Sequence, residues 1–468
     1  MQEGRGKWGT KVGFILAASG SAVGLGNIWK YPHMAGENGG AAFTMVYLIC
    51  IAVVGLPILI GEFVIGRKTQ LSPVGAFSQL APKSGWKFVG FLGVASAFVI
   101  LSFYSVVGGW TIRYTFLAIS TGFQNLAGNP EAASDVFNAF TSSAWNPLFW
   151  HLIFMTLCIW IIVNGVRGGI ERWSKVMMPM IVIILFVLVI RGLSLPGGME
   201  GIKFLFLPKF SELTPQSIVL ALGHSFFTIS LGMGTMITYG SYLGKDQNLL
   251  NSGLLVVVID TVIALMAGIA IFTAVFALGA KPDEGPGLIF TVLPTVFPQI
   301  AGGHLWGSLF FFVLFLAALT SAISILEVIT SYFIDQKGWS RSKATFIFGG
   351  VITGVGAFGS LSMGGFTDFN DVFGLSFFDF LDKSSSKYML PIGGMLTAVF
   401  IAYRWGIPKF IDEVMEGRGG NRPSVVLVRV LFIIAAAVVF FIIANEVVAV
   451  IAGKPIIEFF FPSAQLTT

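Results

Sequence analysis

Two carboxylates, Glu62 and Asp260, stand inside apolar stretches that are long enough to cross a membrane. A charged side chain is costly in the hydrocarbon core of a bilayer, so an acid at this depth is a functional candidate by default. A hard cation such as sodium prefers oxygen ligands from carboxylates, hydroxyls, amides and backbone carbonyls. Cation binding within a membrane is therefore the first chemistry that this sequence indicates.

Two further stretches combine glycines with polar side chains at mid-depth, namely 21–27 (SAVGLGN) and 228–235 (TISLGMGT). Irregular backbone survives in a membrane only where it lines a cavity inside the protein. At such a break, the amino terminus of a half-helix favours an anion and the freed carbonyls favour a cation. Close helix packing by small residues is the alternative explanation for one stretch alone. Two matching stretches, five helices apart, favour a binding site.

Most other chemistry finds no support in the composition. The chain has 468 residues, of which 55% are hydrophobic and 11% charged, about half the charge density of a soluble domain. Cys50 and Cys158 both lie in apolar runs, which argues against a disulfide framework or a metal cluster. The sequence contains no HExxH, P-loop, nucleophile-elbow or cofactor motif, so a membrane enzyme is disfavoured.

A spanning helix needs about 20 mostly apolar residues. Eleven segments meet this requirement: 11–35, 41–66, 88–121, 147–164, 173–193, 216–241, 249–279, 303–334, 342–361, 373–404 and 424–450. The first is not a cleaved signal peptide, because Asn27, Trp29, Lys30 and Pro32 follow without a small-residue cleavage site. We predict a polytopic, all-α membrane protein.

The basic residues orient this topology. With the amino terminus in the cytoplasm, eighteen Lys and Arg fall in the inner loops and five in the outer ones. This distribution follows the positive-inside rule. The net charge of +5 is thus a topology signal, and nucleic-acid binding is not expected. The prediction is an inner-membrane protein in contact with lipid, with a cytoplasmic amino terminus and an extracellular carboxyl terminus.

The two interrupted segments also predict an internal repeat. Five is an odd number, so two consecutive sets of five helices would have opposite orientations in the membrane. The expected units are 1–193 (helices one to five), 194–405 (helices six to ten) and 406–468 (the eleventh helix and the carboxyl terminus). Helices one and six are each expected to be unwound at mid-membrane.

Three motifs resemble the neurotransmitter:sodium symporter family, especially its bacterial amino-acid members with the LeuT-type fold. They are Gly24-Leu25-Gly26-Asn27-Ile28-Trp29, Glu37-Asn38-Gly39-Gly40 and Ser230-Leu231-Gly232-Met233-Gly234. The resemblance extends from about residue 5 to about residue 405. It implies sodium-coupled symport of an amino acid by alternating access.

The resemblance implies two sodium sites and no organic cofactor. The first site would comprise the Ala22 carbonyl, Asn27, Thr228, Asp260 and the carboxylate of the substrate. The second would comprise the carbonyls of Gly20, Val23 and Ala317 and the hydroxyls of Thr320 and Ser321. The shared substrate carboxylate would make amino-acid and sodium binding depend on each other. The second site would tie the first helix to the eighth.

The resemblance also implies where a zwitterionic amino acid would bind. Its carboxylate would meet the amides of Leu25 and Gly26, the first sodium ion and the Tyr104 hydroxyl. Its ammonium group would meet the carbonyls of Ala22, Phe227 and Thr228, with Ser230 adjacent. The side-chain subsite would comprise Ile100, Tyr104, Phe227, Met233, Ser321 and Ile325. This mostly apolar set implies an aliphatic or aromatic amino acid. Because Met233 is flexible, the pocket is expected to be broad.

Several positions bear on ion and substrate choice. Gly24 stands where a monoamine transporter would carry an aspartate, so the substrate should bring its own carboxylate. Asp260 replaces an amide found in many chloride-binding members, which implies chloride independence. Ala264 replaces an acid of some bacterial members and His224 replaces a common amide. Proton antiport through Asp260 or His224 therefore stays open, as does a small neutral amino acid or zwitterionic osmolyte as the substrate.

The resemblance places one gate on each side of the site. On the outside, Lys30 would pair with Asp382 through water, with Asp379 as the rival acid, under a lid of Tyr104 and Phe227. On the inside, Arg5 would pair with Asp335, helped by Trp8 and Tyr242. Isolated surface ion pairs contribute only about 0–1 kcal/mol, which suits a gate that must open.

Three further positions are expected to shape the helices. Glu62 would hydrogen-bond to the unwound sixth segment. Gly169 and Pro179 match a family spacing at the inner end of the fifth helix. Proline weakens a helix there, so unwinding could hydrate the second sodium site, while an ordinary kink is the alternative. A channel or a receptor-like sensor is the remaining competing function, and no protein partner or oligomeric state is indicated.

Overall fold

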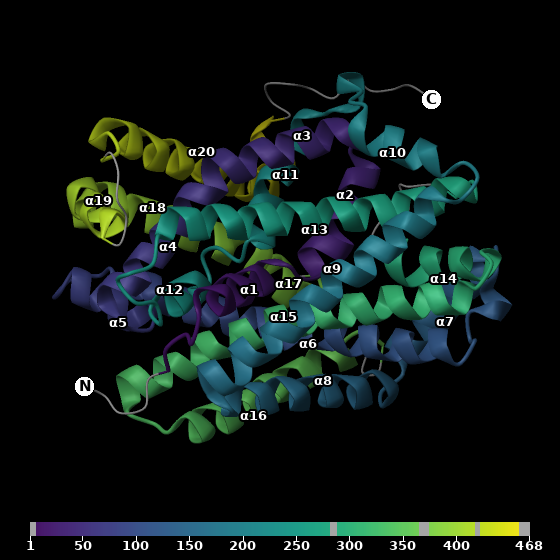
Figure 1. Ribbon diagram of the computed structural model, residues 1–468, viewed down its shortest axis with the longest axis horizontal. Helices are drawn as coiled ribbons and strands as arrows, with labels where there is room; N and C mark the ends of the chain where they lie inside the picture. Colours follow the sequence, from purple (N-terminus) through teal and green to yellow (C-terminus); the bar gives the residue numbers. More distant parts are fainter. Residues whose placement is uncertain (1–5, 281–287, 365–373, 417–421, 458–468) are drawn as a thin grey trace.

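The computed structural model describes residues 6–280, 288–364, 374–416 and 422–457. In these residues the chain forms helices and connecting turns, and the long helices run roughly along the longest axis of the molecule (Figure 1). Nine helices of the described part are long and apolar enough to cross a membrane, and a bent pair adds a tenth. The predicted all-α polytopic class is confirmed.

The long spans have the following bounds. They are α3–η2–α4 (Ala41–Cys50, Ile51–Gly55, Leu56–Thr69), α6 (Lys87–Ile119), α8 (Asn146–Val163), η4–α9 (Val166–Glu171, Arg172–Leu193), α13 (Leu249–Ala277), α15 (Gly303–Lys337), α16 (Arg341–Leu361), α17–η9–α18–η10–α19 (Phe377–Ser384, Ser385–Met389, Leu390–Val399, Phe400–Gly406, Ile407–Met415) and α20 (Val425–Ala452). Short helices lie between them: α5 (Pro73–Leu80), α7 (Pro130–Ser142), α10 (Gly198–Phe206), η6 (Leu288–Val292) and α14 (Leu293–Val296).

Two spans are broken. The first consists of α1 (Lys11–Ala22) and the pair η1–α2 (Gly26–Lys30, Tyr31–Glu37), with a bend of 49°. The other consists of α11 (Pro215–Thr228) and α12 (Thr235–Gly240), each too short to cross a bilayer alone. Between them the backbone is left-handed at Ser230, Gly232 and Gly234, with φ of 55°, 78° and 75°. A Cβ at Gly232 would also overlap the Leu390 carbonyl, so only glycine fits there.

The expected helix boundaries were wrong at two places. The fifth span begins at Val166, ahead of the expected residue 173, because the π-helical turn η4 continues directly into α9. The tenth span continues to Met415, past the expected residue 404. Its extension α19 follows Gly406, whose φ of 97° suits glycine, and buries Ile407, Phe410 and Ile411.

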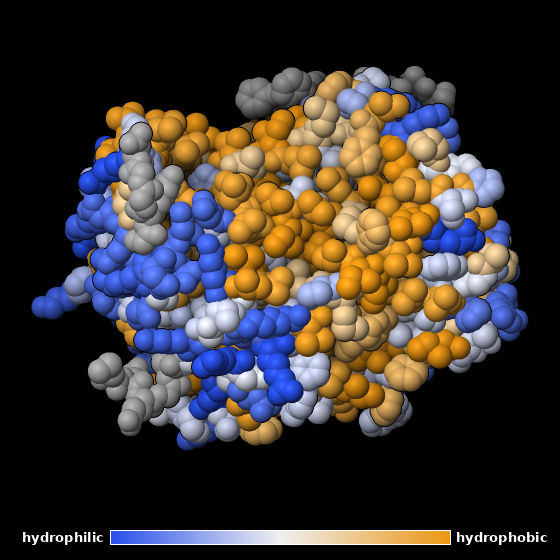
Figure 2. Space-filling view, viewed as in Figure 1, coloured by the Kyte–Doolittle hydropathy of each residue, from blue (hydrophilic) through white to orange (hydrophobic). Residues whose placement is uncertain are grey.

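The surface follows the expected membrane pattern. Figure 2 shows a broad hydrophobic band across the middle of the molecule and hydrophilic side chains towards its ends. Large apolar side chains are widely exposed on the long helices, among them Phe186, Val258, Phe346 and Phe440. In water such a surface would aggregate, whereas in lipid it is solvated. The chain is a multi-pass membrane protein.

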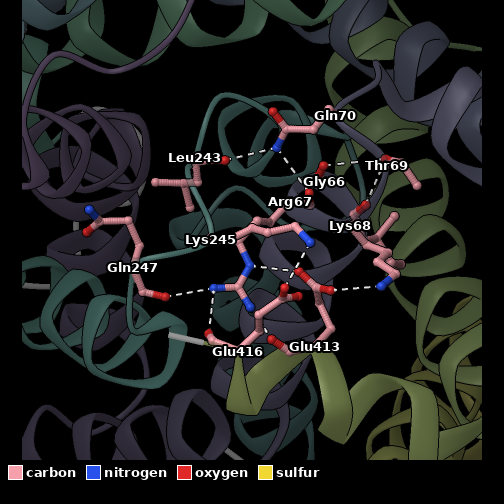
Figure 3. A network of polar contacts seen from close by, with 11 residues as sticks. Gly66, Arg67, Lys68, Thr69, Gln70, Leu243, Lys245, Gln247, Glu413 and Glu416 are labelled. Atoms are coloured by element: carbon pink, nitrogen blue, oxygen red, sulfur yellow. Dashed lines mark hydrogen bonds and ion pairs between the residues drawn. The ribbon is translucent and has the colours of Figure 1, made fainter. Parts of the chain in front are cut away.

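A buried ion pair fixes the loop that follows α12. Arg67 at the end of α4 pairs with Glu413 of α19 at 2.9 Å, and both side chains are at most 1% exposed (Figure 3). Arg67 also donates to the carbonyls of Gln247 and Glu416, at 2.7 and 3.2 Å. Lys68 adds a second cation to Glu413 at 3.2 Å. The network joins α4, α19 and the loop as one unit.

We expect Glu413→Ala to destabilise the protein by about 3–5 kcal/mol, because it leaves the buried Arg67 guanidinium without its carboxylate. The measurement is the midpoint of thermal unfolding in detergent. Glu200→Ala is the control, since Glu200 and its partner Lys203 are both more than half exposed and such pairs contribute about 0–1 kcal/mol. Equal midpoints for the two variants would contradict this prediction.

Candidate functional site

The two broken spans meet at a small cavity in the centre of the molecule. Its volume is about 20 Å³, on the order of one water molecule. Its lining residues are Ser21, Ala22, Gly24, Gly26, Ile100, Tyr104, Phe227, Ser230, Met233, Ser321 and Ile325. Of the residues predicted for the substrate, only Leu25 and Thr228 do not line it. The structure adds Ser21 and Gly24, for which the sequence analysis proposed no substrate contact.

Two of the four groups predicted for the first sodium site, Asn27 and Thr228, lie within hydrogen-bonding distance of a third, the Asp260 carboxylate. The Asn27 side-chain amide donates to Asp260 Oδ1 at 2.7 Å, and Thr228 Oγ1 lies 3.4 Å from Asp260 Oδ2. All three residues are fully buried. The fourth, Ala22, lines the adjacent cavity. The arrangement concentrates oxygen atoms and a carboxylate beside the break in the first span.

The groups predicted for the second sodium site are also connected. Ser321 Oγ lies 3.4 Å from the Gly20 carbonyl and 3.3 Å from the Val23 carbonyl. Thr320 Oγ1 lies 3.4 Å from the Val23 carbonyl and 2.9 Å from that of Ala317. A hydroxyl carries one proton, so two hydroxyls cannot satisfy all of these carbonyls at once. The spare acceptor capacity suits a hard cation.

Hydrogen bonds across the cavity tie the two breaks together. The Leu25 amide donates to the Tyr104 hydroxyl of α6 at 3.1 Å. Ser230, in the second break, donates to the Ser21 carbonyl at 2.8 Å. Glu62 of α4 accepts from the Gly232 amide at 2.8 Å. The backbone exposed by each break is therefore held by side chains from its neighbours.

The two residues predicted for the outer gate, Lys30 and Asp382, are in direct contact. Lys30 Nζ lies 3.1 Å from Asp382 Oδ1, so the pair does not need the water that the sequence analysis placed between them. The same ammonium lies 4.1 Å from the centroid of the Phe227 ring, a cation–π distance. The rival Asp379 instead accepts from Ser376, which caps the start of α17. The geometry favours Asp382 as the gate acid.

On the inner side, Arg5 lies outside the described residues. Asp335 accepts a hydrogen bond from the Ser72 amide at 2.6 Å. Trp8 donates from its indole to the Tyr239 carbonyl at 3.0 Å and packs against the Tyr242 ring, with centroids 6.2 Å apart. Three of the four predicted inner-gate residues thus lie beside the start of α1, beyond the end of α12 and near the end of α15.

A buried acid in this region was missed. Glu327 of α15 is fully buried, accepts from the Tyr242 hydroxyl at 2.5 Å and forms a bidentate pair with Arg341, at 2.6 and 2.8 Å. The signal was available, because Glu327 stands inside the apolar segment 303–334 just as Asp260 does inside its own. The three residues join the end of α12 to α15 and α16.

The remaining predicted positions are placed as follows. Gly169 is buried in η4, and Pro179 lies inside α9 with its ring exposed. His224 is buried, with its ring centroid 5.2 Å from that of Tyr47, and its Nε2 has no hydrogen-bond partner among the described residues. Ala264 is buried within α13. None of these positions lines the central cavity.

Two broken spans, with buried oxygen clusters beside a small cavity between them, are the architecture of a secondary transporter of the LeuT fold. The sequence profile of the Sodium:neurotransmitter symporter family matches residues 5–131 and 141–467. The chain belongs to this family of sodium-coupled secondary transporters and is a sodium-dependent transporter, not an enzyme.

Three relatives support this assignment. The uncharacterized sodium-dependent transporter YhdH of Bacillus subtilis is 41% identical, over 89% of this chain and 92% of its own. An uncharacterized sodium-dependent transporter of Haemophilus influenzae is 34% identical, over 85% and 89%. The motifs also resemble those of MhsT, a bacterial member. The crystal structure of MhsT in complex with L-phenylalanine superposes with a TM-score of 0.85, at 44% identity, covering 94% of this chain and all of that one.

We expect Asp382→Asn to slow transport up to about fivefold, the effect of losing an ion pair of about 1 kcal/mol. The cation–π contact of Lys30 with Phe227 remains and limits the loss. The initial rate of substrate uptake into proteoliposomes is the measurement. Asp379→Asn is the matched control and should stay within about twofold of the wild type. A larger effect of Asp379→Asn than of Asp382→Asn would contradict the prediction and make Asp379 the gate acid.

Proposed function

We propose that this protein imports hydrophobic L-amino acids together with sodium, by alternating access and without chloride. The observation that carries the proposal is the convergence of Asn27, Thr228 and Asp260 beside the central cavity. A substrate carboxylate placed in that cavity would complete a sodium site with these groups. The ion and the amino acid would then stabilise each other, which is the basis of coupled transport.

Asp260 supports chloride independence. Its carboxylate supplies a fixed negative charge next to the proposed sodium ion, so no exogenous anion is needed to balance the cation. The hydroxyl and carbonyl groups around Thr320 and Ser321 form the second proposed sodium site. Two sodium ions per substrate follow from these two oxygen clusters.

The cavity lining supports an apolar substrate side chain. Ile100, Phe227, Met233 and Ile325 offer no polar group to a ligand. MhsT, whose fold this chain shares, binds L-phenylalanine in its crystal structure. At about 20 Å³ the cavity must widen for any amino acid, and a small neutral amino acid, the second candidate, would require the least widening. A larger substrate requires Phe227 and the flexible Met233 to move aside.

We further propose the arrangement of the protein in the cell membrane. The inverted repeats would be 1–193 and 194–405, with 406–468 as an addition. The amino terminus would lie in the cytoplasm, together with the Arg67–Glu413 network and the Trp8–Tyr242 contact, and the carboxyl terminus outside. The Lys30–Asp382 pair would then face the exterior, as an outer gate should.

Uptake of labelled phenylalanine, leucine and glycine into proteoliposomes tests the function. We expect concentrative phenylalanine and leucine uptake that requires an inward sodium gradient and is unchanged when gluconate replaces chloride. Asp260→Ala should abolish it, because the proposed first sodium site loses the carboxylate that the protein supplies. Uptake of glycine alone would select the second candidate. Uptake that ignores sodium would refute the sodium sites.

Met233 provides a sharper test of the side-chain subsite. We expect Met233→Phe to reduce tryptophan uptake by about tenfold relative to leucine uptake, since a rigid ring in place of a flexible side chain overpacks the pocket for a bulky substrate. Met233→Leu conserves volume and is the control. An unchanged ratio of tryptophan to leucine uptake in Met233→Phe would place Met233 outside the subsite.

A further inference from the structure

The cytoplasmic start of α1 is held by a single carboxylate from the fifth span. Glu171, the last residue of η4, accepts from the Gly9 amide at 2.6 Å and from the Thr10 hydroxyl at 2.9 Å. Lys175, one turn further on, pairs with the same carboxylate at 2.6 Å. The Glu171 side chain is only 3% exposed. Hydrogen bonds to a charged, buried acceptor are stronger than neutral ones.

The residues around this contact leave room for the Glu171 carboxylate. Thr10 is the N-cap of α1 and accepts from the Gly13 amide at 3.0 Å. A Cβ at Gly13 would overlap the Glu171 carboxylate, so a side chain there would expel it. A negative charge at this position also complements the positive end of the helix dipole. Glu171 therefore holds the N-cap residue of α1 from a different helix.

The same two helices meet again beside the second proposed sodium site. A Cβ at Gly20 would lie 3.2 Å from Met178 Sδ of α9 and 3.2 Å from Thr320 Cβ of α15. Gly20 is thus wedged between α9 and α15, and its carbonyl faces Ser321. From Thr10 to Gly20, α1 rises about 15 Å as one rigid helix. Movement at its start would carry the Gly20 carbonyl away from Thr320 and Ser321.

We propose that Glu171 is a positioning residue that keeps the second sodium site closed to the cytoplasm by anchoring the start of α1 to the fifth span. This inference rests on the sodium-coupled transport proposed above. Glu171 lies between Gly169 and Pro179, in a π-helical turn that follows Gly165 at φ 83°. These are weak points of a helix. Loosening there would withdraw the carboxylate from Gly9 and Thr10 and release α1.

A second set of contacts, made by Trp8, also anchors the start of α1, and substitutions of Glu171 do not remove them. Trp8 donates from its indole to the Tyr239 carbonyl, and its amide lies 3.4 Å from the Tyr242 carbonyl. These contacts join α1 to α12, whereas Glu171 joins it to α9. Removing Glu171 alone should therefore free α1 from the fifth span without unfolding the protein.

Amide hydrogen exchange followed by mass spectrometry tests the anchor on the full-length protein in sodium. In Glu171→Ala we expect peptides from 9–22 and 166–180 to exchange about tenfold faster, the effect of losing a hydrogen bond to a charged group. Peptides from 303–337 should not change. Glu171→Gln preserves the shape and should lie between Glu171→Ala and the wild type. Glu200→Gln, the same change at an exposed acid of α10, should match the wild type.

Uptake separates anchoring from a merely structural role. We expect the sodium concentration for half-maximal uptake to rise about tenfold in Glu171→Ala, while the half-saturating amino-acid concentration at saturating sodium stays within about twofold. Wild-type uptake in sodium and in potassium tests the proposed function separately. The role of Glu171 would be overturned by unchanged exchange in 9–22 or by faster exchange that includes 303–337. Equal losses in sodium affinity and amino-acid affinity would also overturn it.

Discussion

A backbone carbonyl or amide that leaves its helix inside a membrane must find a partner within the protein, because lipid offers none. The breaks after Ala22 and after Thr228 impose this requirement on the whole structure. Glu62 meets it for the Gly232 amide, Tyr104 for the Leu25 amide and Ser230 for the Ser21 carbonyl. The carbonyls of Gly20, Val23 and Ala317 face the two hydroxyls of Thr320 and Ser321, and this shortage of donors is why we propose a sodium ion there.

Two charged networks hold the chain after α12, and they differ in how firmly they are buried. Arg67 and Glu413 join α4 to α19 through a fully buried ion pair, and a part-buried hydrogen bond from Arg67 to the Gln247 carbonyl adds the loop after α12, which suits a permanent joint. Tyr242 reaches Glu327 through one hydroxyl, which is a contact that one side-chain rotation can release. The region after α12 is thus joined to α4 and α19 through Arg67 and to α15 through the Tyr242 hydroxyl.

The sequence was most informative where a residue type conflicts with its surroundings. Acids in apolar runs and glycines at mid-depth predicted the breaks, and the family motifs assigned most of the cavity lining. Glu171 escaped notice because it stands near the end of a span, where acids are common. The extension α19 was missed because Gly406 and Pro408 resemble a helix end. The directness of the Lys30–Asp382 contact and the size of the cavity depend on side-chain packing, which no single sequence pattern specifies.

The proposed coupling depends most on the substrate carboxylate acting as a ligand of the first sodium ion. Equilibrium binding of labelled phenylalanine to the purified protein, titrated with sodium, tests this directly. We expect phenylalanine affinity to rise with sodium concentration, and sodium affinity to rise with phenylalanine concentration by the same factor. Asp260→Ala should remove both effects. Phenylalanine binding of equal affinity in sodium and in potassium would contradict the proposed coupling.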